Sequence, residues 1–334
     1  MRLTRRALHA RTHDGLKLHV LAVHPQHLPD DAPSLLLLHG FAQNHHTFDA
    51  PGRSLTEHLA RQGMAVYAGD LRGHGDSPAA RRHHPHAFAD YVNHDVPAML
   101  HAIRTERPRG PMRMLGHSMG GLVAASLPHH AAQLLSAVCV VCPPMAFFQR
   151  LARMNGPIAW GLRRYAGLAS AARVPLMTRS VGLMLHAMRG VLDHPRFPML
   201  MPVWAPRSME GKLLAWALRH TFSNEGNHVL ADLFQLGATH GSRCGAVHVM
   251  ERVEALRAPL LVVAADHDGL APPRDVRPLH DRAGSTLKRF MVFGRREHRH
   301  RFGHLDVLIG RHAPDVVWPV LGRFLATGGA ALEK

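Results

Sequence analysis

Short apolar runs alternate with helix-like segments between residues 34 and 143, and this alternation limits the possible folds more than any other feature of the chain. The runs SLLLLHG and MAVYAGD are apolar throughout rather than at every second position, as expected of strands that are covered on both faces. Helix-like segments separate such runs, and parallel strands need crossover connections of that kind. We therefore predict an α/β fold with a mostly parallel, doubly wound sheet.

The alternation follows a predicted hairpin and is interrupted once. Asp14 and Gly15 separate two strand-like runs near the N-terminus, and this residue pair is typical of a hairpin turn. Residues 144–247 are rich in Met, Leu, Ala, Arg and Trp, form helix-like stretches and have little strand character. We predict a core domain of residues 1–143 and 248–334 with a helical cap, or lid, inserted at 144–247. The alternative is a second helical layer without a gating role.

Ser118 stands between two glycines where a strand-like run meets a helix-like segment, in the sequence GHSMGG. A nucleophilic serine needs an exposed hydroxyl, a base nearby and backbone N–H donors beside it. A sharp strand-to-helix turn provides all three, and it requires small residues such as Gly116 and Gly120 two positions away on either side. The pattern G-x-S-x-G is weak evidence by itself, but this placement makes Ser118 the candidate nucleophile.

Four loops of the chain resemble those of the α/β-hydrolase superfamily, and the resemblance extends over nearly the whole sequence. LLLLHGFAQNHHTFD resembles a strand with its oxyanion loop, GHSMGG a nucleophile elbow, AADHDGLAPP an acid loop and FGHLDVLIG a histidine loop. Their order along the chain is also that of the superfamily. The resemblance implies a serine hydrolase of the esterase and lipase type, with a Ser-His-Asp triad and no metal or organic cofactor.

The same resemblance implies Asp268 as the acid of the triad and His304 as its base. Asp266 is the alternative acid, but it ends the strand, whereas Asp268 precedes Gly-Leu-Ala-Pro in the loop where the superfamily's acid falls. His298 and His300 are alternative bases, but His304 has the superfamily's Gly-His pattern before the last helix. His304 would take the proton of the serine hydroxyl, and the carboxylate would orient the imidazole.

The resemblance places the oxyanion hole at the backbone N–H groups of Phe41 and Met119. The alternative for His39-Gly40, just before Phe41, is a tight turn after a strand without a chemical role. Methionine-rich surfaces adapt to variable apolar ligands, so the cap composition predicts an apolar acyl chain, although each residue singly fits the cap's own core as well. The residues concerned are Trp160, Met184, Met188, Phe197, Met199, Met201, Trp204 and Trp216.

Three functions are open on the sequence alone. The leading hypothesis is hydrolysis of a carboxylic ester as a small-molecule substrate. The second is an acyltransferase that uses the same acyl-enzyme, and the third is a non-catalytic binding protein with the α/β-hydrolase fold. The apparently complete set of Ser118, Asp268 and His304 argues against the third.

The remaining composition excludes several other classes. The formal charge is +16, but the arginines are scattered and no helix-turn-helix or RNA-binding pattern is present, so we expect no nucleic-acid partner. Cys139 and Cys142 lie three apart on a predicted strand and would face opposite sides, which argues against a disulfide or shared metal. No H-E-x-x-H pattern accompanies the 30 histidines, and we expect most clustered ones at the surface. No apolar run suits a membrane helix or secretory signal, so we predict a cytoplasmic protein.

Overall fold

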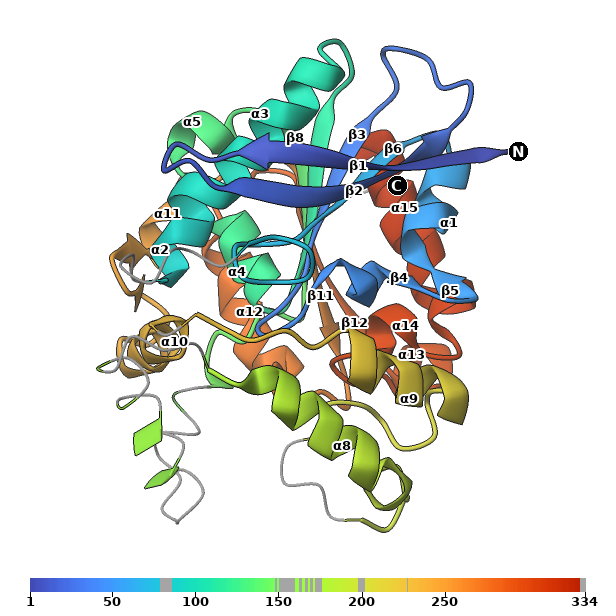
Figure 1. The fold of residues 1–334 in the computed structure, drawn as a ribbon, viewed down its shortest axis with the longest axis vertical. Coiled ribbons are helices and arrows are strands. Elements are labelled where there is room, and N and C mark those ends of the chain that lie inside the picture. The colour runs from blue at the N-terminus through green and yellow to red at the C-terminus, as the bar shows by residue number, and fades with distance from the viewer. Residues whose placement is uncertain are drawn as a thin grey trace.

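A single eight-stranded sheet forms the centre of the part of the chain that the computed structural model describes, which is residues 1–78, 86–147, 176–197, 202–226 and 228–330 and residues 149, 160, 161, 164, 165, 168 and 171. Its strands are β1 (Leu3–Arg11), β2 (Lys17–Pro25), β3 (Ser34–Leu38), β6 (Ala65–Gly69), β7 (Met112–His117), β8 (Leu135–Val141), β11 (Leu260–Ala265) and β12 (Lys288–Phe293). Their spatial order is β1-β2-β6-β3-β7-β8-β11-β12 (Figure 1).

Six neighbouring strands of this sheet, from β6 to β12, run parallel to one another. Only β2 runs against its neighbours, since it pairs antiparallel with both β1 and β6. Both predictions are confirmed, that of a mostly parallel sheet and that of an N-terminal hairpin. Gly15 in the hairpin turn has a φ of 87°, which glycine adopts at no steric cost.

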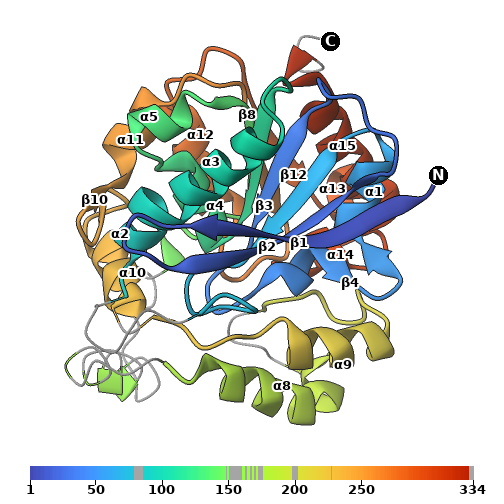
Figure 2. The same ribbon diagram turned by 45° about the horizontal axis from the view of Figure 1, so that its top comes forward.

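Helices cover both faces of the sheet, as a doubly wound fold requires. Figure 2 shows the first and last helices of the core on one side and several others on the opposite side. The first and last are α1 (Leu55–Arg61) and α15 (Trp318–Thr327), and the others include α3 (Val96–Glu106), α4 (Met119–Ala125), α5 (His129–Ala132), α11 (Val249–Ala255) and α12 (Pro273–Arg282). All five residues of β3 and of β6 are buried, which explains their continuous apolar sequence.

Shorter elements complete the core, and single residues explain two details of its helices. The first helix begins at Leu55, because the Ser54 side chain accepts a hydrogen bond from Glu57 N–H and caps it. A π-helical turn over Tyr91–Asp95 precedes α3, and Pro97 lies in the first turn of α3, where its missing N–H group costs no helical hydrogen bond. The short elements are η1 (His45–Phe48), β4 (Asp49–Ala50), β5 (Arg53–Ser54), α2 (Phe88–Asp90), η2 (Tyr91–Asp95), α13 (Arg295–His298), α14 (Asp306–Ile309) and η3 (Ala313–Val317).

In its described residues, the segment between β8 and β11 consists mainly of helices and adds no strand to the eight-stranded sheet. Two of its helices lie together along one end of the molecule, at the bottom of Figure 2. These elements are α8 (Thr178–Leu192), α9 (Gly211–His220), α10 (Val229–Ala238) and the two-residue strands β9 (Arg243–Cys244) and β10 (Val247–His248). The helix-like stretch WGLRRYAGLASAARV at residues 160–174 lies mostly outside the described residues. None of the helices described is both long enough and apolar enough to span a bilayer.

Candidate active site

Ser118 occupies a sharp turn between the end of β7 and the start of α4. Its φ of 54° and ψ of −123° are strained for a residue with a side chain, and such strain is typical of functional positions. Gly116 and Gly120 make the turn possible. A Cβ atom at Gly116 would lie 2.1 Å from the Gly120 carbonyl oxygen, and one at Gly120 would lie 2.4 Å from the carbonyl oxygens of Leu38 and His39.

The close approach at Gly120 predicts a large loss of stability for Gly120→Ala. Because the obstructing atoms are backbone oxygens of the neighbouring loop, neither can move aside as a side chain would. We expect the unfolding free energy to fall by about 3 kcal/mol or more, as for overpacking in a rigid core. Gly190→Ala is the matched control, because Gly190 lies in α8 with no atom near a new Cβ. It should stabilise the protein by about 0.5–1 kcal/mol in urea denaturation. Equal effects of the two changes would contradict the packing described for the turn.

His304 and Asp268 form a buried hydrogen-bonded pair beside this turn. His304 Nδ1 lies 2.7 Å from Asp268 Oδ2, and the other carboxylate oxygen accepts the N–H groups of Leu270 and Ala271 at 2.7 and 2.8 Å. Burial raises the pKa of Asp268, but the adjacent His304 and the two backbone donors outweigh it, so the pKa lies below its ordinary value. The carboxylate therefore stays charged and fixes the imidazole with Nε2 as its remaining nitrogen.

The alternative acid and bases lie elsewhere. Asp266 accepts the backbone N–H groups of Arg295 at 2.9 Å and Phe302 at 3.0 Å, so it holds the turn after β12. His300 stacks on His312 with ring centroids 3.6 Å apart. Of the two candidate acids and three candidate bases, Asp268 and His304 are thus the pair that a hydrogen bond joins among the described residues.

Ser118 and His304 line the same cavity, which has a volume of about 250 Å³. Among the described residues no hydrogen bond joins the Ser118 hydroxyl to the imidazole, and such contacts often tighten only when substrate binds. The backbone of the oxyanion loop passes directly beside the serine, because a Cβ at Gly40 would lie 2.8 Å from Ser118 Cβ. Phe41, the next residue, also lines the cavity.

The apolar lining of this cavity differs from the one expected. Of the cap residues named from the sequence, Trp204 lines it, whereas Trp160, Met184 and Met188 are exposed. Met184 and Met188 belong to the same helix as the cavity-lining Val181 and Leu185, but neither of them lines the cavity. Phe197 and Trp216 line other cavities, and Met199 and Met201 fall outside the described residues. The apolar residues that line the cavity instead are Val181, Leu185, Val203, Leu218, Phe222, Leu270 and Leu305.

Glu225 is a residue of this region that the sequence did not single out. It lies in the segment between α9 and α10, is fully buried, and accepts the backbone N–H of Ala42 at 2.7 Å. Ala42 directly follows Phe41, has a φ of 57°, and its carbonyl accepts the N–H of Ser223 at 2.8 Å. Both polar groups of the Ala42 backbone are therefore held by residues between α9 and α10.

Two buried side chains complete the surroundings of Glu225. Tyr91 donates its hydroxyl to one carboxylate oxygen, and His74 Nε2 lies 3.4 Å from the other. Burial raises the pKa of Glu225, but the charge of His74 and these hydrogen bonds outweigh it and lower the pKa to about 2. The sequence offers one indication of a role for Glu225, which is that acidic residues are rare around it. Residues 144–247 contain four of them, Asp193, Glu210, Glu225 and Asp232.

Two of the clustered histidines, His45 and His86, are buried, whereas His46, His298 and His300 are partly exposed. His45 Nδ1 and His19 Nδ1 lie 2.8 and 3.0 Å from Asp70 Oδ2, and His86 is buried beside Tyr91. The pairing with a buried carboxylate offsets the cost of burying polar rings. His83 and His84 lie outside the described residues.

In the part of the chain that the structure describes, two groups of side chains bring possible metal ligands within 4.8 Å of one another. Asp70, in the group with His19, His45 and Asp76, is a hub that accepts hydrogen bonds from both imidazoles and from two backbone N–H groups. The other group joins Cys142 to the Asp268–His304 pair. Hydrogen bonds within the protein thus account for the arrangement around Asp70 and for the Asp268–His304 pair.

We expect the free energy of unfolding to fall in mild acid, because three histidines are buried in their neutral form. Burial is the main cause that lowers the pKa of His39 to about 4 and those of His86 and His117 to about 3. In the unfolded chain these rings titrate near pH 6.5, so below that pH the unfolded state binds more protons and the unfolding free energy falls. We expect a loss of about 1.4 kcal/mol per histidine per pH unit as the pH drops from about 6 to 4.

The check is the urea midpoint of wild type and of His117→Gln across that pH range. His117 donates Nε2–H to the His304 carbonyl at 2.9 Å, and the glutamine amide keeps a donor there. When the unfolding free energy is plotted against pH, the slope for the variant should be smaller by the contribution of one proton, which is about 1.4 kcal/mol per pH unit. A wild-type midpoint that stays constant from pH 6.5 to 4.5 would contradict the neutral buried rings.

Comparison with known proteins decides the family. The family model described as serine aminopeptidase, S33, matches residues 30–302, which is most of the chain. The chain belongs to this family. It is an α/β hydrolase of the esterase and lipase type. The match ends two residues before His304, so it does not itself test the base.

Individual relatives of this α/β hydrolase carry related names. The pimeloyl-[acyl-carrier protein] methyl ester esterase of Neisseria meningitidis serogroup B is 28% identical over 271 residues, covering 78% of this chain and 84% of that protein. The monoacylglycerol lipase of Mycolicibacterium smegmatis is 27% identical over 281 residues, covering 79% and 81%. An esterase structure from Exiguobacterium antarcticum superposes with a TM-score of 0.59 at 16% identity, covering 98% of this chain and all of that one, which shows a shared fold.

Proposed function

We propose that this α/β hydrolase cleaves a carboxylic ester with an apolar acyl chain through Ser118, His304 and Asp268. The single observation that supports this most strongly is the orientation of His304 by Asp268 in the cavity that Ser118 lines. A serine hydroxyl, an imidazole with a fixed tautomer and a charged carboxylate form the set that acyl transfer to serine requires. The names of the esterase and lipase relatives support the same substrate class.

The reaction follows from these roles. His304 Nε2 removes the hydroxyl proton as Ser118 Oγ attacks the ester carbonyl, and Asp268 stabilises the imidazolium that forms. The backbone N–H groups of Phe41 and Met119 receive the oxyanion, and Met119 begins α4, where N–H groups are free. The imidazolium then gives its proton to the alcohol as it leaves. Water, activated by His304 in the same way, releases the carboxylic acid and restores the serine.

The lining of the cavity supports an apolar acyl group. Side chains of α8 and α9, such as Leu185 and Leu218, line the cavity together with Leu270 and Leu305 of the core. We extend the proposal to the domain division: residues 144–247 act as the cap of a core made of 1–143 and 248–334. The three free, buried cysteines fit the reducing cytoplasm, which we propose as the location.

A chain-length series of methyl or aryl esters tests this proposal. Each methylene that enters the apolar cavity should raise kcat/KM roughly fourfold until the cavity is full, since burying one CH₂ contributes about 0.8 kcal/mol. Leu185→Trp, which fills the cavity, should shift the optimum to shorter chains, and Leu183→Trp on the exposed face of α8 should not. A rate independent of chain length, or one that falls from the shortest ester, would contradict the assignment.

The contact between Glu225 and the oxyanion loop predicts a transition-state effect for Glu225→Gln. Loss of the charge weakens the hydrogen bond that fixes Ala42, so the adjacent Phe41 N–H loses its fixed direction. We expect kcat to fall about tenfold or more while KM changes little, because the oxyanion exists only in the transition state.

An alkyl boronic acid, which forms a tetrahedral adduct, distinguishes this positioning role from general destabilisation. Its affinity should fall in parallel with kcat in Glu225→Gln. The control is Glu210→Gln, because Glu210 pairs with Arg53 at 2.8 Å and does not contact the oxyanion loop. A Glu225 variant that lowers the urea midpoint but keeps kcat and boronate affinity would show a purely structural role.

A further inference from the structure

A second cavity shares part of its wall with the catalytic cavity. It has a volume of about 530 Å³, and Trp204 lines both spaces. His267, the neighbour of Asp268 in the chain, also lines it, as do residues of the segment that leads to His304. The ester-cleavage mechanism gives this cavity no role, although Trp204 lines both it and the catalytic cavity.

The lining of this cavity is strongly basic. Four arginines and three histidines contribute to it, and no aspartate or glutamate does. These side chains come from the inserted segment, from the loop after β11, from the segment after β12 and from the loop after α14. The residues are Arg207, His267, Arg295, Arg299, His300, Arg301 and His312.

The nearby acids do not neutralise these arginines. Asp266 uses its two oxygens on the backbone N–H groups of Arg295 and Phe302. Asp193 accepts Trp204 Nε1–H at 3.1 Å and the backbone N–H of Arg207 at 2.8 Å. Across the described ranges, none of the four guanidinium groups of this cavity takes part in a salt bridge.

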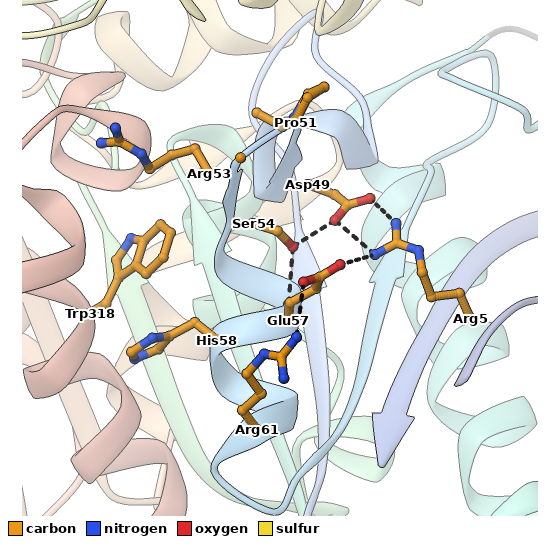
Figure 3. A pocket seen from close by; sticks show the side chains of 11 residues that line it. Arg5, Asp49, Pro51, Arg53, Ser54, Glu57, His58, Arg61 and Trp318 are labelled. Carbon is orange, nitrogen blue, oxygen red and sulfur yellow. Dashed lines mark hydrogen bonds and ion pairs between the residues drawn. The ribbon is translucent and has the colours of Figure 1, made fainter. Parts of the chain in front are cut away.

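A cavity of similar size elsewhere shows what a compensated set of charges looks like. Figure 3 shows the cavity of about 490 Å³ beside α1, where Arg5 forms ion pairs with Asp49 and Glu57. Arg61 lies 3.7 Å from Glu57, so the carboxylates of that cavity are shared among its arginines. The net charge of +16 alone therefore does not produce uncompensated cavities, and the basic cavity beside Trp204 is a local feature.

The histidines of the basic cavity respond to the positive charge around them. Burial is the first cause that lowers the pKa of His267, and the charge of Arg301 lowers it further. The pKa of His312 is lowered by burial and then by His300 and Arg311. These rings therefore remain neutral donors or acceptors near pH 7, and the arginines supply the charge.

Guanidinium groups bind carboxylate and phosphate oxygens with paired, charge-assisted hydrogen bonds. We propose that the basic cavity binds a carboxylate or phosphate group carried by the ester substrate. Because Trp204 lines both cavities, the charged end of the substrate would lie on one side of this side chain and the ester that Ser118 attacks on the other. This inference rests on the proposed ester hydrolysis and narrows its substrate class to esters that carry a negative charge away from the reacting carbonyl.

The kinetic test compares methyl octanoate with two charged analogues. One is the monomethyl ester of octanedioic acid, and the other is a methyl ester of similar length that ends in a phosphate group. Wild type should favour at least one charged ester over methyl octanoate by tenfold or more in kcat/KM, and 0.5 M salt should reduce the preference. The analogue that is preferred identifies the group as carboxylate or phosphate.

Two matched double variants locate the effect. Arg295→Gln with Arg301→Gln removes two charges from the cavity, at positions whose backbone has no positive φ. The ratio of kcat/KM for the charged ester to kcat/KM for methyl octanoate should then fall towards one. Arg274→Gln with Arg289→Gln removes two exposed charges that line none of the cavities described, so it should keep the wild-type ratio. A preference that persists in the first pair, or is lost equally in both, overturns the proposal.

A measurement of binding affinity tests the anion site even if the enzyme does not turn the esters over. In calorimetry, Ser118→Ala should bind the charged ester at least tenfold more tightly than methyl octanoate. The same variant with Arg295→Gln and Arg301→Gln added should bind the two esters equally. Equal affinity for charged and neutral esters overturns the proposed anion site. Failure of wild type to hydrolyse any of the esters would instead count against the proposed function, while the calorimetry still reports on the cavity.

Discussion

Alanine at position 118 is expected to lower kcat for a chromogenic ester by about four to six orders of magnitude while the protein remains folded. The side chain lies at the turn between β7 and α4 and lines the catalytic cavity, so its hydroxyl is the group that attacks. His304→Ala should cause a loss of similar size, because serine and histidine act as one unit and their effects do not add. Initial rates, with circular dichroism and the urea midpoint as checks of folding, measure this.

His300→Ala is the matched control for the base. His300 lies in the segment before His304, but it stacks on His312 and lines the basic cavity rather than the catalytic one. With an uncharged ester this variant should stay within a few-fold of the wild-type rate, far from the loss at His304. A fully active His304→Ala would contradict the proposed base and transfer the role to His298 or His300.

Asp268→Asn is expected to lower kcat by about four orders of magnitude at neutral pH. An asparagine of the same shape keeps an oxygen or an amide near His304 Nδ1, but it cannot stabilise the imidazolium and no longer selects the tautomer with Nε2 free. The two backbone N–H donors of Leu270 and Ala271 would hold the asparagine in place, so little change in the fold should accompany the loss.

Asp266→Asn provides the comparison for the acid, because the two residues lie two apart in one loop. Asp266 binds backbone N–H groups of Arg295 and Phe302 and no imidazole, so its variant should lose about 1–3 kcal/mol of stability and keep kcat within a few-fold. Paired measurement of kcat and urea midpoint separates the two roles. A catalytic loss at Asp266 that matches or exceeds the loss at Asp268 would reverse the assignment of the acid.

The sheet and the serine turn could be predicted because local sequence determines them. Strands such as β3 are buried along their whole length, so their sequence is a continuous apolar run that can be recognised without the structure. Gly116 and Gly120 are needed at contacts between neighbouring backbones, so their identity also appears in the sequence. The roles of Asp268 and His304 could be predicted only from the resemblance to a known family. Their contact is a tertiary one between residues 36 apart in the chain, which the fold brings together.

Other features depend on tertiary contacts that leave no pattern in the sequence. Glu225 meets Ala42 across 183 residues of chain, and nothing around either residue indicates the partner. The face of α8 that meets the cavity could not be chosen, because apolar residues such as Leu183 and Leu185 occur on both its exposed and its buried side. Scattered arginines likewise gave no sign of the basic cavity, which four separate segments form.

Mass spectrometry of the protein after reaction with a fluorophosphonate tests the central claim most directly, since such reagents modify only an activated serine. The expected result is one adduct per chain on the peptide that contains Ser118, absent from Ser118→Ala and strongly slowed in His304→Ala. An adduct on another residue, or ester hydrolysis that continues without modification of Ser118, would contradict the assignment of Ser118 as the nucleophile.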